Sequence, residues 1–535
     1  MSDHHHVHPT ASTYDVIVVG AGAAGLSGAL ALGRARRTVL VLDAGHPRNA
    51  PALHIHNYLG REGTSPADFL AIGRAEVAQY GVEVRDAQAL GASKRGDGSF
   101  VVTTSDGDVT ARRLLVTTGL VDELPAIPGV AEGWGDSVIH CPYCHGWEVQ
   151  DQPIGVLASN PLSVHQAQLF RQWSDDVVLF LNDQPALGEE QAEGLAARRI
   201  PVVEGAVVGW GPDGVRLASG ELVARQALVV GAPVRARAEL LVSLGLETSE
   251  FEMGGHSFGT CVVADPMGLT AVPGVFVAGN VTDPRATVIA AAAAGLMVGA
   301  AINLDLITSE IALAVEQRRF FAEEAWEERY RETPDGRWSG NPNAVLVSEV
   351  SDLVPGRALD VGCGEGGDAL WLAARGWAVT GIDISTVALA RATQHAESQG
   401  LQIRWAHVDL VQNPPEPGRF DLVTAHFMQL PATERVALYA ALAKAVAPGG
   451  TLLLVGHDPS GMPPGGPHLH DMFFTAEQLA AELDGGEWDI RTVEARPRPW
   501  TDPDGNASII KDAVLKAVKR PWAPAQAPAS AEPVR

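Results

Sequence analysis

Cysteine is scarce in this sequence, and basic residues are outnumbered by acidic ones. The 535 residues include only 4 cysteines (Cys141, Cys144, Cys261 and Cys363), too few for a disulfide framework. Lys and Arg number 39 against 64 Asp and Glu; the charge of −25 argues against nucleic acid or an anionic membrane as a partner. Residues 1–12 are polar and lack an apolar run, so we expect no signal peptide and a reducing, cytoplasmic location.

Long hydrophobic runs are also few. The segment 286–302 is nearly free of polar groups, but it is Ala/Gly-rich, short for a membrane span and closely flanked by charged residues. We therefore predict a buried helix and no membrane segment. The remaining composition, with 46% hydrophobic residues and 57 glycines, is typical of a compact α/β protein, and the length allows two or three domains.

Two of the cysteines, Cys141 and Cys144, lie two residues apart in the stretch HCPYCHGWE. Such a pair could hold a metal, form a structural disulfide or exchange electrons. Zinc normally needs a second pair of ligands at similar spacing, and Cys261 and Cys363 are isolated, so we predict no metal site. Redox exchange is the leading interpretation, provided that an electron carrier binds nearby.

The N-terminal segment has the pattern of a dinucleotide-binding unit. The β-branched run YDVIVV (14–19) leads directly into Gly20, Gly22 and Gly25 and then into a helical segment. Glycines at this spacing permit a tight turn, close approach of the backbone to a pyrophosphate, and packing of the helix on the strand. The next strand, TVLVLDAG, places Asp43 about 20 residues further on, where it suits a ribose hydroxyl.

A late stretch, VPGVFVAGNVTDP (272–284), adds a strand and a following Ala-rich helix. Together with the GAGAAG loop it resembles the thioredoxin-reductase-like flavoproteins, which are commonly homodimers. The resemblance implies an α/β fold in which an FAD-binding domain is interrupted by an inserted nucleotide-binding-like domain. HNYLG (56–60) and LLVTTG (114–119) resemble the family's flavin-side loop and returning strand. The residues that it implies for FAD are Gly20, Gly22, Gly25, Asp43, Asn57, Thr118, Gly119, Gly279, Asn280 (where Asp is usual) and Thr287.

The cysteine pair falls where this family carries its active-site disulfide. The resemblance implies that Cys144 faces the flavin as the charge-transfer thiolate and that Cys141 attacks the substrate. His145 stands where an Asp is usual, and an imidazole there could exchange protons during thiol–disulfide exchange. The alternative is a surface histidine at a helix start with no catalytic role.

The second nucleotide loop that a thioredoxin reductase needs is missing. The strand PIGVLAS (153–159) is followed by Asn160, Pro161, Leu162 and Ser163 in place of GxGxxG, and Pro161 has no amide hydrogen for a phosphate. This argues against tight NAD(P)H binding in the usual manner. The stretch CPYCHGWE with such a loop resembles the dithiol oxidases of gliotoxin- and holomycin-type biosynthesis. We therefore expect oxidation of a small-molecule dithiol with O2; the alternatives are an NAD(P)H-dependent disulfide reductase and a non-catalytic redox sensor.

From Arg357 onward, strands and helices alternate again, which predicts a second, doubly wound Rossmann-like sheet. The motif Asp360-x-Gly362-x-Gly364-x-Gly366 after its first strand resembles motif I of class I S-adenosylmethionine (SAM) methyltransferases. By this resemblance Asp383 suits the ribose and Asp409 the adenine amino group. His426 and His457 follow strands at the carboxyl edge and are further candidates.

The stretch AWEERYRETPDGRWSGNPN (325–343) resembles the N-terminal lid of thiopurine- and tellurite-type methyltransferases, which act on soft nucleophiles. Trp326, Tyr330 and Trp338 could enclose the sulfonium and the substrate, or simply pack in an amphipathic helix. We therefore predict a bifunctional enzyme for thiols. The expected parts are a disordered tail 1–12, FAD-domain segments 13–125 and 245–308, an inserted domain 126–244, a helical connector 309–324, a methyltransferase domain 325–518 and a disordered tail 519–535.

Overall fold

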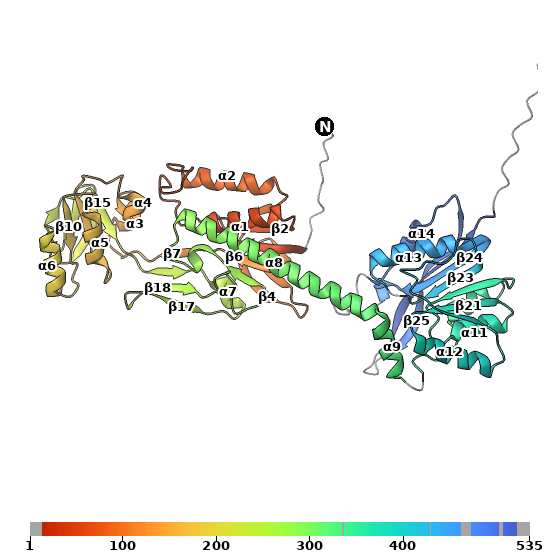
Figure 1. Ribbon diagram of the computed structural model, residues 1–535. Helices are drawn as coiled ribbons and strands as arrows, with labels where there is room; N and C mark the ends of the chain where they lie inside the picture. The colour runs from red at the N-terminus through yellow and green to blue at the C-terminus, as the bar shows by residue number, and fades with distance from the viewer. Residues whose placement is uncertain (1–12, 334–335, 429, 462–471, 502–506, 522–535) are drawn as a thin grey trace, which may run out of the picture. The chain divides into compact units, whose positions relative to one another are not determined.

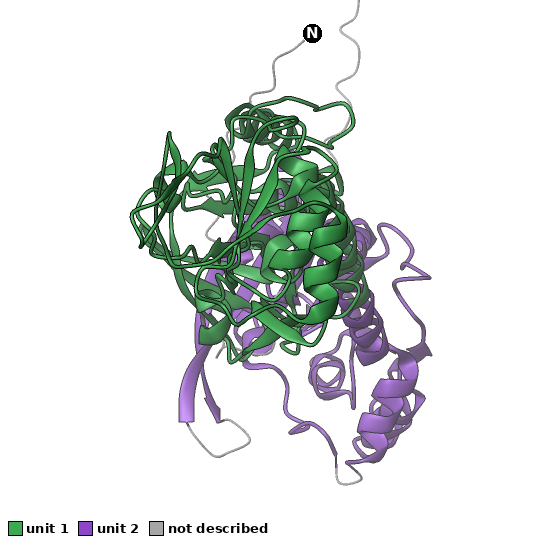
Figure 2. Cartoon of the chain, turned by 90° about the vertical axis from the view of Figure 1, so that its left-hand side faces the viewer, with its two compact units in different colours: residues 1–308 green, residues 309–535 purple. Residues whose placement is uncertain are grey.

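The computed structural model divides the chain into two compact units, residues 1–308 and 309–535 (Figure 2). Both units are built of sheets flanked by helices, which confirms the predicted α/β class. The tails expected to be disordered, 1–12 and nearly all of 519–535, lie outside the described residues. The structure describes residues 13–333, 336–428, 430–461, 472–501 and 507–521.

The first unit contains a sheet whose strands run in the order β3-β2-β1-β6-β5-β4, with β19 paired to β6. The strands β3, β2, β1, β6 and β19 are mutually parallel, and β4 and β5 join as antiparallel neighbours. Both faces of β1 and β2 are buried because they alternate with crossover helices. The bounds are β1 Thr13–Val19, β2 Val39–Asp43, β3 Glu83–Asp86, β4 Ala89–Lys94, β5 Phe100–Thr104, β6 Gly107–Val116 and β19 Val275–Val277.

Three helices accompany this sheet: α1 Ala23–Arg34, α2 Pro66–Ala78 and α8 Val288–Phe321 (Figure 1). Helix α8 packs against α1 without intervening side chains, because a Cβ on Gly295 would lie 1.9 Å from the carbonyl oxygen of Ala24. The prediction that 286–302 is a buried helix holds for only one side of the helix. The glycine side packs on α1, whereas Leu296 and Met297 on the other side are 51% and 56% exposed. By length and composition alone α8 is long and apolar enough to cross a membrane. Within this chain, 39% of its apolar window is buried.

The inserted part forms a parallel sheet in the order β11-β10-β9-β15-β8. Two short strands, β7 Leu120–Asp122 and β16 Val234–Ala236, carry the chain into and out of it and pair antiparallel with each other. Its bounds are β8 Val138–Ile139, α4 Pro142–His145, β9 Ile154–Leu157, α5 Ser163–Phe170, β10 Val177–Phe180, α6 Glu189–Ala197, β11 Val202–Val203 and β15 Ala227–Val230. Smaller sheets are β12 Val207–Gly211, β13 Gly214–Leu217 and β14 Leu222–Val223, and β17 Thr248–Met253 with β18 His256–Val262.

The second unit is a seven-stranded sheet in the order β22-β21-β20-β23-β24-β26-β25. The chain order reverses between β20 and β23, and the carboxyl ends beside such a switch point are where ligands bind in doubly wound sheets. Every strand predicted from the alternating pattern is present: β20 Arg357–Val361, β21 Ala378–Asp383, β22 Arg404–His407, β23 Phe420–His426 and β24 Val446–His457. The antiparallel pair β25 Trp488–Thr501 and β26 Ala507–Lys519 completes the sheet and was not predicted.

Helices of the second unit lie on both faces of this sheet (Figure 1). The expected connector begins as a continuation of α8 and is followed directly by α9 Glu323–Arg331. Helix α13 stops at Ala445, and residues 446–450 belong to β24. The helix bounds are α10 Ala344–Val350, α11 Gly367–Ala374, α12 Thr386–Ser398, α13 Ala432–Ala445 and α14 Ala476–Ala481.

Candidate active sites

The glycine loop between β1 and α1 has the shape of a pyrophosphate cradle. Gly20 has φ +106°, a conformation that residues with a Cβ rarely adopt, and a Cβ on Gly25 would lie 1.8 Å from the carbonyl oxygen of Gly20. A Cβ on Gly22, by contrast, would meet no atom within 4 Å. Gly22 is also the N-cap of α1 and provides no side-chain cap. The loop therefore leaves open space at an uncapped helix N-terminus, which fits a diphosphate such as that of FAD.

Two other residues predicted for FAD, Asp43 and Thr118, already have hydrogen-bond partners within the protein. The Asp43 carboxylate accepts hydrogen bonds from the Gly45 amide (3.2 Å) and from Arg74, so a ribose would share it with that guanidinium. Thr118 donates to the carbonyl of Arg237 at 2.5 Å, and the following Gly119 has φ +72°. These two residues lie just after β6, beside β1, as the predicted returning strand requires.

The contacts of Asn280 explain why an amide stands here in place of the usual Asp. Its side-chain amide donates to three carbonyl oxygens of the turn that leads into α8: those of Asp283 (3.1 Å), Pro284 (3.4 Å) and Ala286 (2.9 Å). A carboxylate could donate none of these bonds. Gly279, with φ +77°, and Thr287, at the entrance to α8, bracket the same turn. The amide therefore organises the turn that leads to Thr287, a residue predicted for FAD, and into α8.

Cys141 and Cys144 are half-buried free thiols at the start of α4. A hydrogen bond from the Cys144 side chain lowers the pKa of Cys141 to about 7. Burial acts in the opposite direction and raises this pKa, whereas the backbone amides of Tyr143 and Cys144 and the charge of Arg48 lower it further. The same hydrogen bond and burial raise the pKa of Cys144 above its usual value. Cys141 is thus the sulfur that ionises near neutral pH, which suits its predicted role as the attacking thiol.

The loop predicted to lie beside the flavin contacts the segment of the cysteine pair. The side-chain amide of Asn57 donates to the carbonyl of Tyr143, which lies between the two cysteines. Asn57 has φ +60°, an unusual conformation for a residue other than glycine, and its backbone amide donates to Glu62 at 2.8 Å. The contact places a residue predicted for FAD against the cysteine pair, as the redox hypothesis requires.

His145 lies within a small group of titratable side chains. Its Nδ1 is buried and has no hydrogen-bond partner among the described residues, and burial lowers its pKa. Sequence reasoning missed two neighbours: His56, whose Nε2 lies 3.3 Å from a Glu148 oxygen, and Glu148 itself. It also missed Arg48, which forms a two-point ion pair with Asp122 at 2.6 and 2.8 Å. The signal for Arg48 exists only in three dimensions, because its partner lies 74 residues away.

The loop that replaces the second glycine motif is closed on itself. The backbone amides of Ser159 and Asn160 both donate to the hydroxyl of Ser163 at 3.2 Å, and the amide of Leu162 donates to the side chain of Asn160 at 2.8 Å. The amide of Ser163 donates to the carbonyl of Asn160, and residue 161 is a proline. The backbone N–H groups of residues 159, 160, 162 and 163 therefore all have partners within the loop, and Pro161 has no N–H.

In the second unit, the motif I glycines form a turn after β20. Gly362, Gly364 and Gly366 have φ values of +68°, +52° and +91°, so side chains at these positions would strain the backbone. The Gly364 amide donates to the Asp383 carboxylate at 2.8 Å, which joins the ends of β20 and β21.

Asp360 carries the clearest sign of a ligand. Its Oδ2 is buried without a partner among the described residues, and burial, together with Asp368 and Asp383, raises its pKa. A buried orphan acceptor beside a glycine turn fits the ammonium group of SAM's methionyl part. Asp409 lies after β22, where its carboxylate accepts from the Val411 amide at 2.9 Å within its own turn.

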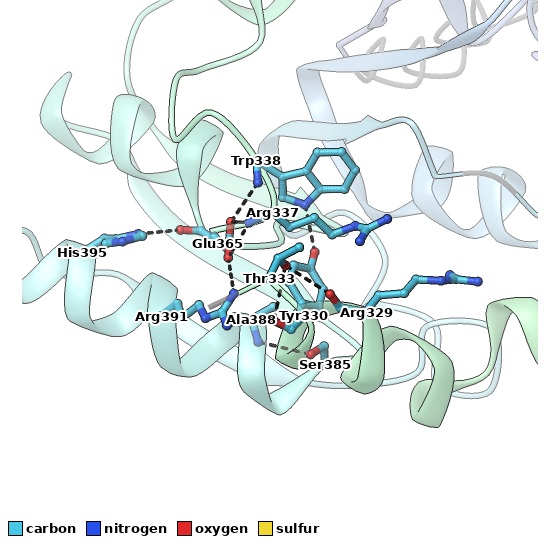
Figure 3. Close-up of polar contacts among 10 residues, drawn as sticks. All are labelled: Arg329, Tyr330, Thr333, Arg337, Trp338, Glu365, Ser385, Ala388, Arg391 and His395. Atoms are coloured by element: carbon cyan, nitrogen blue, oxygen red, sulfur yellow. Dashed lines mark hydrogen bonds and ion pairs between the residues drawn. The ribbon is translucent and has the colours of Figure 1, made fainter. Parts of the chain in front are cut away.

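Two of the three predicted aromatic residues reach motif I (Figure 3). A Cβ on Gly364 would lie 3.0 Å from the Tyr330 hydroxyl and 3.4 Å from the Trp338 ring, and Trp338 Nε1 donates to Tyr330 at 3.1 Å. Trp326 instead packs away from the glycine turn within the described residues: its ring centroid lies 6.1 Å from that of Tyr330, and the guanidinium of Arg329 lies over it at 4.7 Å.

Two carboxylates that sequence reasoning missed hold this aromatic segment in place. Glu365, within motif I, accepts hydrogen bonds from the backbone amides of Arg337 and Trp338 and forms an ion pair with Arg391 of α12 at 2.7 Å (Figure 3). Glu327 of α9 reaches the first turn of α12, where it accepts from the Thr386 hydroxyl at 2.8 Å. The predicted lid segment is therefore held at Glu327 and at residues 337–338.

Comparison with known proteins places each unit in a class. Residues 14–295 match the family model of pyridine nucleotide-disulphide oxidoreductases, and residues 358–450 match that of a methyltransferase domain. The first match covers more than half of the chain, which therefore belongs to the pyridine nucleotide-disulphide oxidoreductase family. The chain is an enzyme that joins an oxidoreductase to a methyltransferase; the first family implies a flavin and the second implies SAM.

Individual relatives narrow the class to thioredoxin-reductase-like proteins. The thioredoxin reductase tcpT of Claviceps purpurea is 33% identical over 288 residues, which are 51% of this chain and 87% of the relative. The thioredoxin reductase sirT of Leptosphaeria maculans is 29% identical over 56% of this chain and 97% of its own length. The crystal structure of HlmI is 43% identical, covers 59% of this chain and 99% of its own, and superposes with a TM-score of 0.55.

Proposed function

We propose that the first unit oxidises a small-molecule dithiol to its disulfide, with FAD as cofactor and O2 as final acceptor. The observation that carries this proposal is the closed loop at 159–163, whose amides already have internal partners. A nicotinamide dinucleotide would have to break those bonds to gain its phosphate contacts. A dithiol can instead deliver its electrons directly through the cysteine pair.

The chemistry assigned to this chain's own residues starts from the Cys141–Cys144 disulfide. A substrate thiolate attacks Cys141 and releases Cys144 as a thiolate, and the second substrate thiol attacks the mixed disulfide and releases Cys141. His145 accepts the proton of a substrate thiol, a role that suits an imidazole kept neutral by burial. FAD held at the glycine loop of Gly20, Gly22 and Gly25 would supply the two-electron oxidation of the Cys141–Cys144 dithiol, and with O2 as acceptor the product would be hydrogen peroxide.

For the second unit we propose SAM-dependent methylation of a thiol or another soft nucleophile. The support is the aromatic lid: Tyr330 and Trp338 lie over the glycine turn, where their rings can face a sulfonium. Both halves then act on thiols, one by oxidation and the other by S-methylation.

An anaerobic titration tests the first part. We expect the flavin of the full-length protein to be bleached by a small dithiol and not by NADPH, and air to restore its colour with release of hydrogen peroxide. The variant Cys141→Ser is the control, because it should keep FAD but lose bleaching by dithiol. Rapid bleaching by NADPH would favour a reductase, and a flavin that no dithiol reduces would favour a redox sensor.

The second part is tested with labelled SAM and the same dithiols. We expect an S-methyl product from the full-length protein and none from the variant Asp383→Ala. Absence of any methylated thiol would contradict this half of the proposal.

A further inference from the structure

Two histidine–aspartate pairs lie at the carboxyl end of the methyltransferase sheet, and they differ in one respect. His426 ends β23 and His457 ends the neighbouring strand β24. Both Nδ1 atoms lie near a carboxylate, at 2.6 Å from Asp368 and 3.3 Å from Asp512. Only His457 has a ring nitrogen without a hydrogen bond from the described residues.

The His426 pair is closed. Its Nε2 lies 2.8 Å from the hydroxyl of Thr424, so both ring nitrogens have partners, and the side chain is only 6% exposed. An imidazole with two fixed partners can neither accept nor release a proton without breaking a bond. The His426 pair is therefore structural: it ties the end of β23 to the first turn of α11.

In the His457 pair, Asp512 is fixed by a further partner, while Nε2 of His457 has no hydrogen bond from the described residues. Asp512 is 3% exposed and accepts from Arg498 at 2.7 and 3.2 Å. Burial would raise the pKa of Asp512, but its hydrogen bonds with His457 and Arg498 outweigh burial and lower it. An ionised carboxylate beside Nδ1 selects the tautomer with the proton on Nδ1 and leaves Nε2 as an acceptor. The carboxylate of the neighbouring residue, Asp458, accepts hydrogen bonds from the hydroxyl (2.5 Å) and the backbone amide (2.9 Å) of Ser460.

A chain of contacts connects His457 to motif I. Its ring lies against Phe427, with centroids 4.8 Å apart, and Phe427 has the strained φ of +53°. The next residue, Met428, covers the glycine turn, because a Cβ on Gly362 would lie 2.5 Å from its sulfur. The open imidazole therefore belongs to the same sheet edge as motif I, on the side of the switch point away from Asp383.

We propose that His457 is the general base of the methyl transfer and that Asp512 and Arg498 are its positioning residues. Nε2 takes the proton of the substrate S–H as the sulfur forms its bond to the methyl group. The bond from that methyl group to the sulfonium of SAM breaks in the same step, which yields the thioether and S-adenosylhomocysteine. The imidazolium then returns its proton to water. This inference rests on the proposed methylation of thiols.

Thiols of different acidity test the assignment. An alkyl thiol such as 2-mercaptoethanol needs the base, whereas 4-nitrothiophenol is already ionised at neutral pH. We expect His457→Gln to lower kcat for the alkyl thiol by about 100-fold, the lower end of what a general base contributes, and to leave the aryl thiol close to wild type. His426→Gln is the matched control and should affect both thiols alike.

A second measurement does not depend on turnover. In the histidine NMR spectrum of the full-length protein without SAM, we expect neutral His457 as the Nδ1–H tautomer. Equal loss of both thiol activities in His457→Gln, or an Nε2–H tautomer, would overturn the assignment while the proposed methylation stands. A wild-type protein that methylates neither thiol would overturn both.

Discussion

Glu365 lies 2.7 Å from Arg391, and this ion pair connects the methyltransferase glycine turn to helix α12. The Glu365 side chain is only 4% exposed, and it also accepts from the amides of the lid. Burial raises the pKa of Glu365, but Arg391 and the two lid amides outweigh it and lower the pKa overall. The carboxylate is therefore ionised and shared between the motif, the helix and the lid.

We expect Glu365→Gln to destabilise the second unit by about 3 kcal/mol, because it leaves the partly buried Arg391 guanidinium, which is 19% exposed, without its counter-charge. Because the lid amides lose an ionised acceptor, SAM should also bind more weakly. Thermal unfolding and calorimetric titration with SAM measure the two effects. Arg391→Gln and the double variant complete a mutant cycle, in which strictly additive losses would contradict the pairing.

The acidity of Cys141 depends on a hydrogen bond from Cys144. With its pKa at about 7, the Cys141 thiolate should react with iodoacetamide increasingly as the pH rises through 7, and little below pH 6. Cys144→Ala removes the donor, so the midpoint should move upward toward that of an ordinary thiol. Cys144→Ser keeps a donating hydroxyl and should move it less. Mass spectrometry of the Cys141 peptide gives the extent of reaction; identical midpoints in all three proteins would contradict this cause.

Replacing Gly22 or Gly25 of the first motif by alanine should impair the protein for different reasons. Gly22→Ala places a methyl group in open space, so the fold should keep its stability while FAD binding falls sharply. Gly25→Ala drives a Cβ into the carbonyl of Gly20 and should destabilise the unit by at least about 2 kcal/mol. The flavin absorbance of the purified proteins and the melting temperature of their flavin-free forms separate the two results. A Gly22→Ala protein with full FAD content would contradict the cradle.

Replacing Asn280 by the usual Asp should be unfavourable here. The new carboxylate would face the three carbonyl oxygens that the amide now serves, at a cost of about 1–3 kcal/mol at neutral pH. The penalty should shrink as the pH falls toward about 4, because a protonated carboxyl can donate again. Denaturant unfolding of the flavin-free protein at several pH values checks this. Asn280→Ala, which has no charge, is the control and should show no such dependence on pH.

Part of the site could be predicted because its pattern is local. The cysteine pair, both glycine loops and their strands were found from segments of a few residues, and the missing second glycine motif was visible in Asn160 and Pro161. The prediction that 286–302 is buried held for only one side of the helix, because apolar composition does not show which side packs against a neighbouring element. Leu296 and Met297 face outward although nothing in their residue type distinguishes them from the packed residues.

The sequence by itself determined the fold class, and it predicted two glycine motifs for nucleotides and a cysteine pair for redox exchange, because strand period and residue spacing are properties of short segments. Only the tertiary structure decided which charged groups surround these motifs. Arg48 and Asp122 are 74 residues apart, Glu365 and Arg391 are 26 apart, and His457 and Asp512 are 55 apart. Ion pairs and hydrogen bonds act over a few ångströms of space, and the distance along the chain does not predict them.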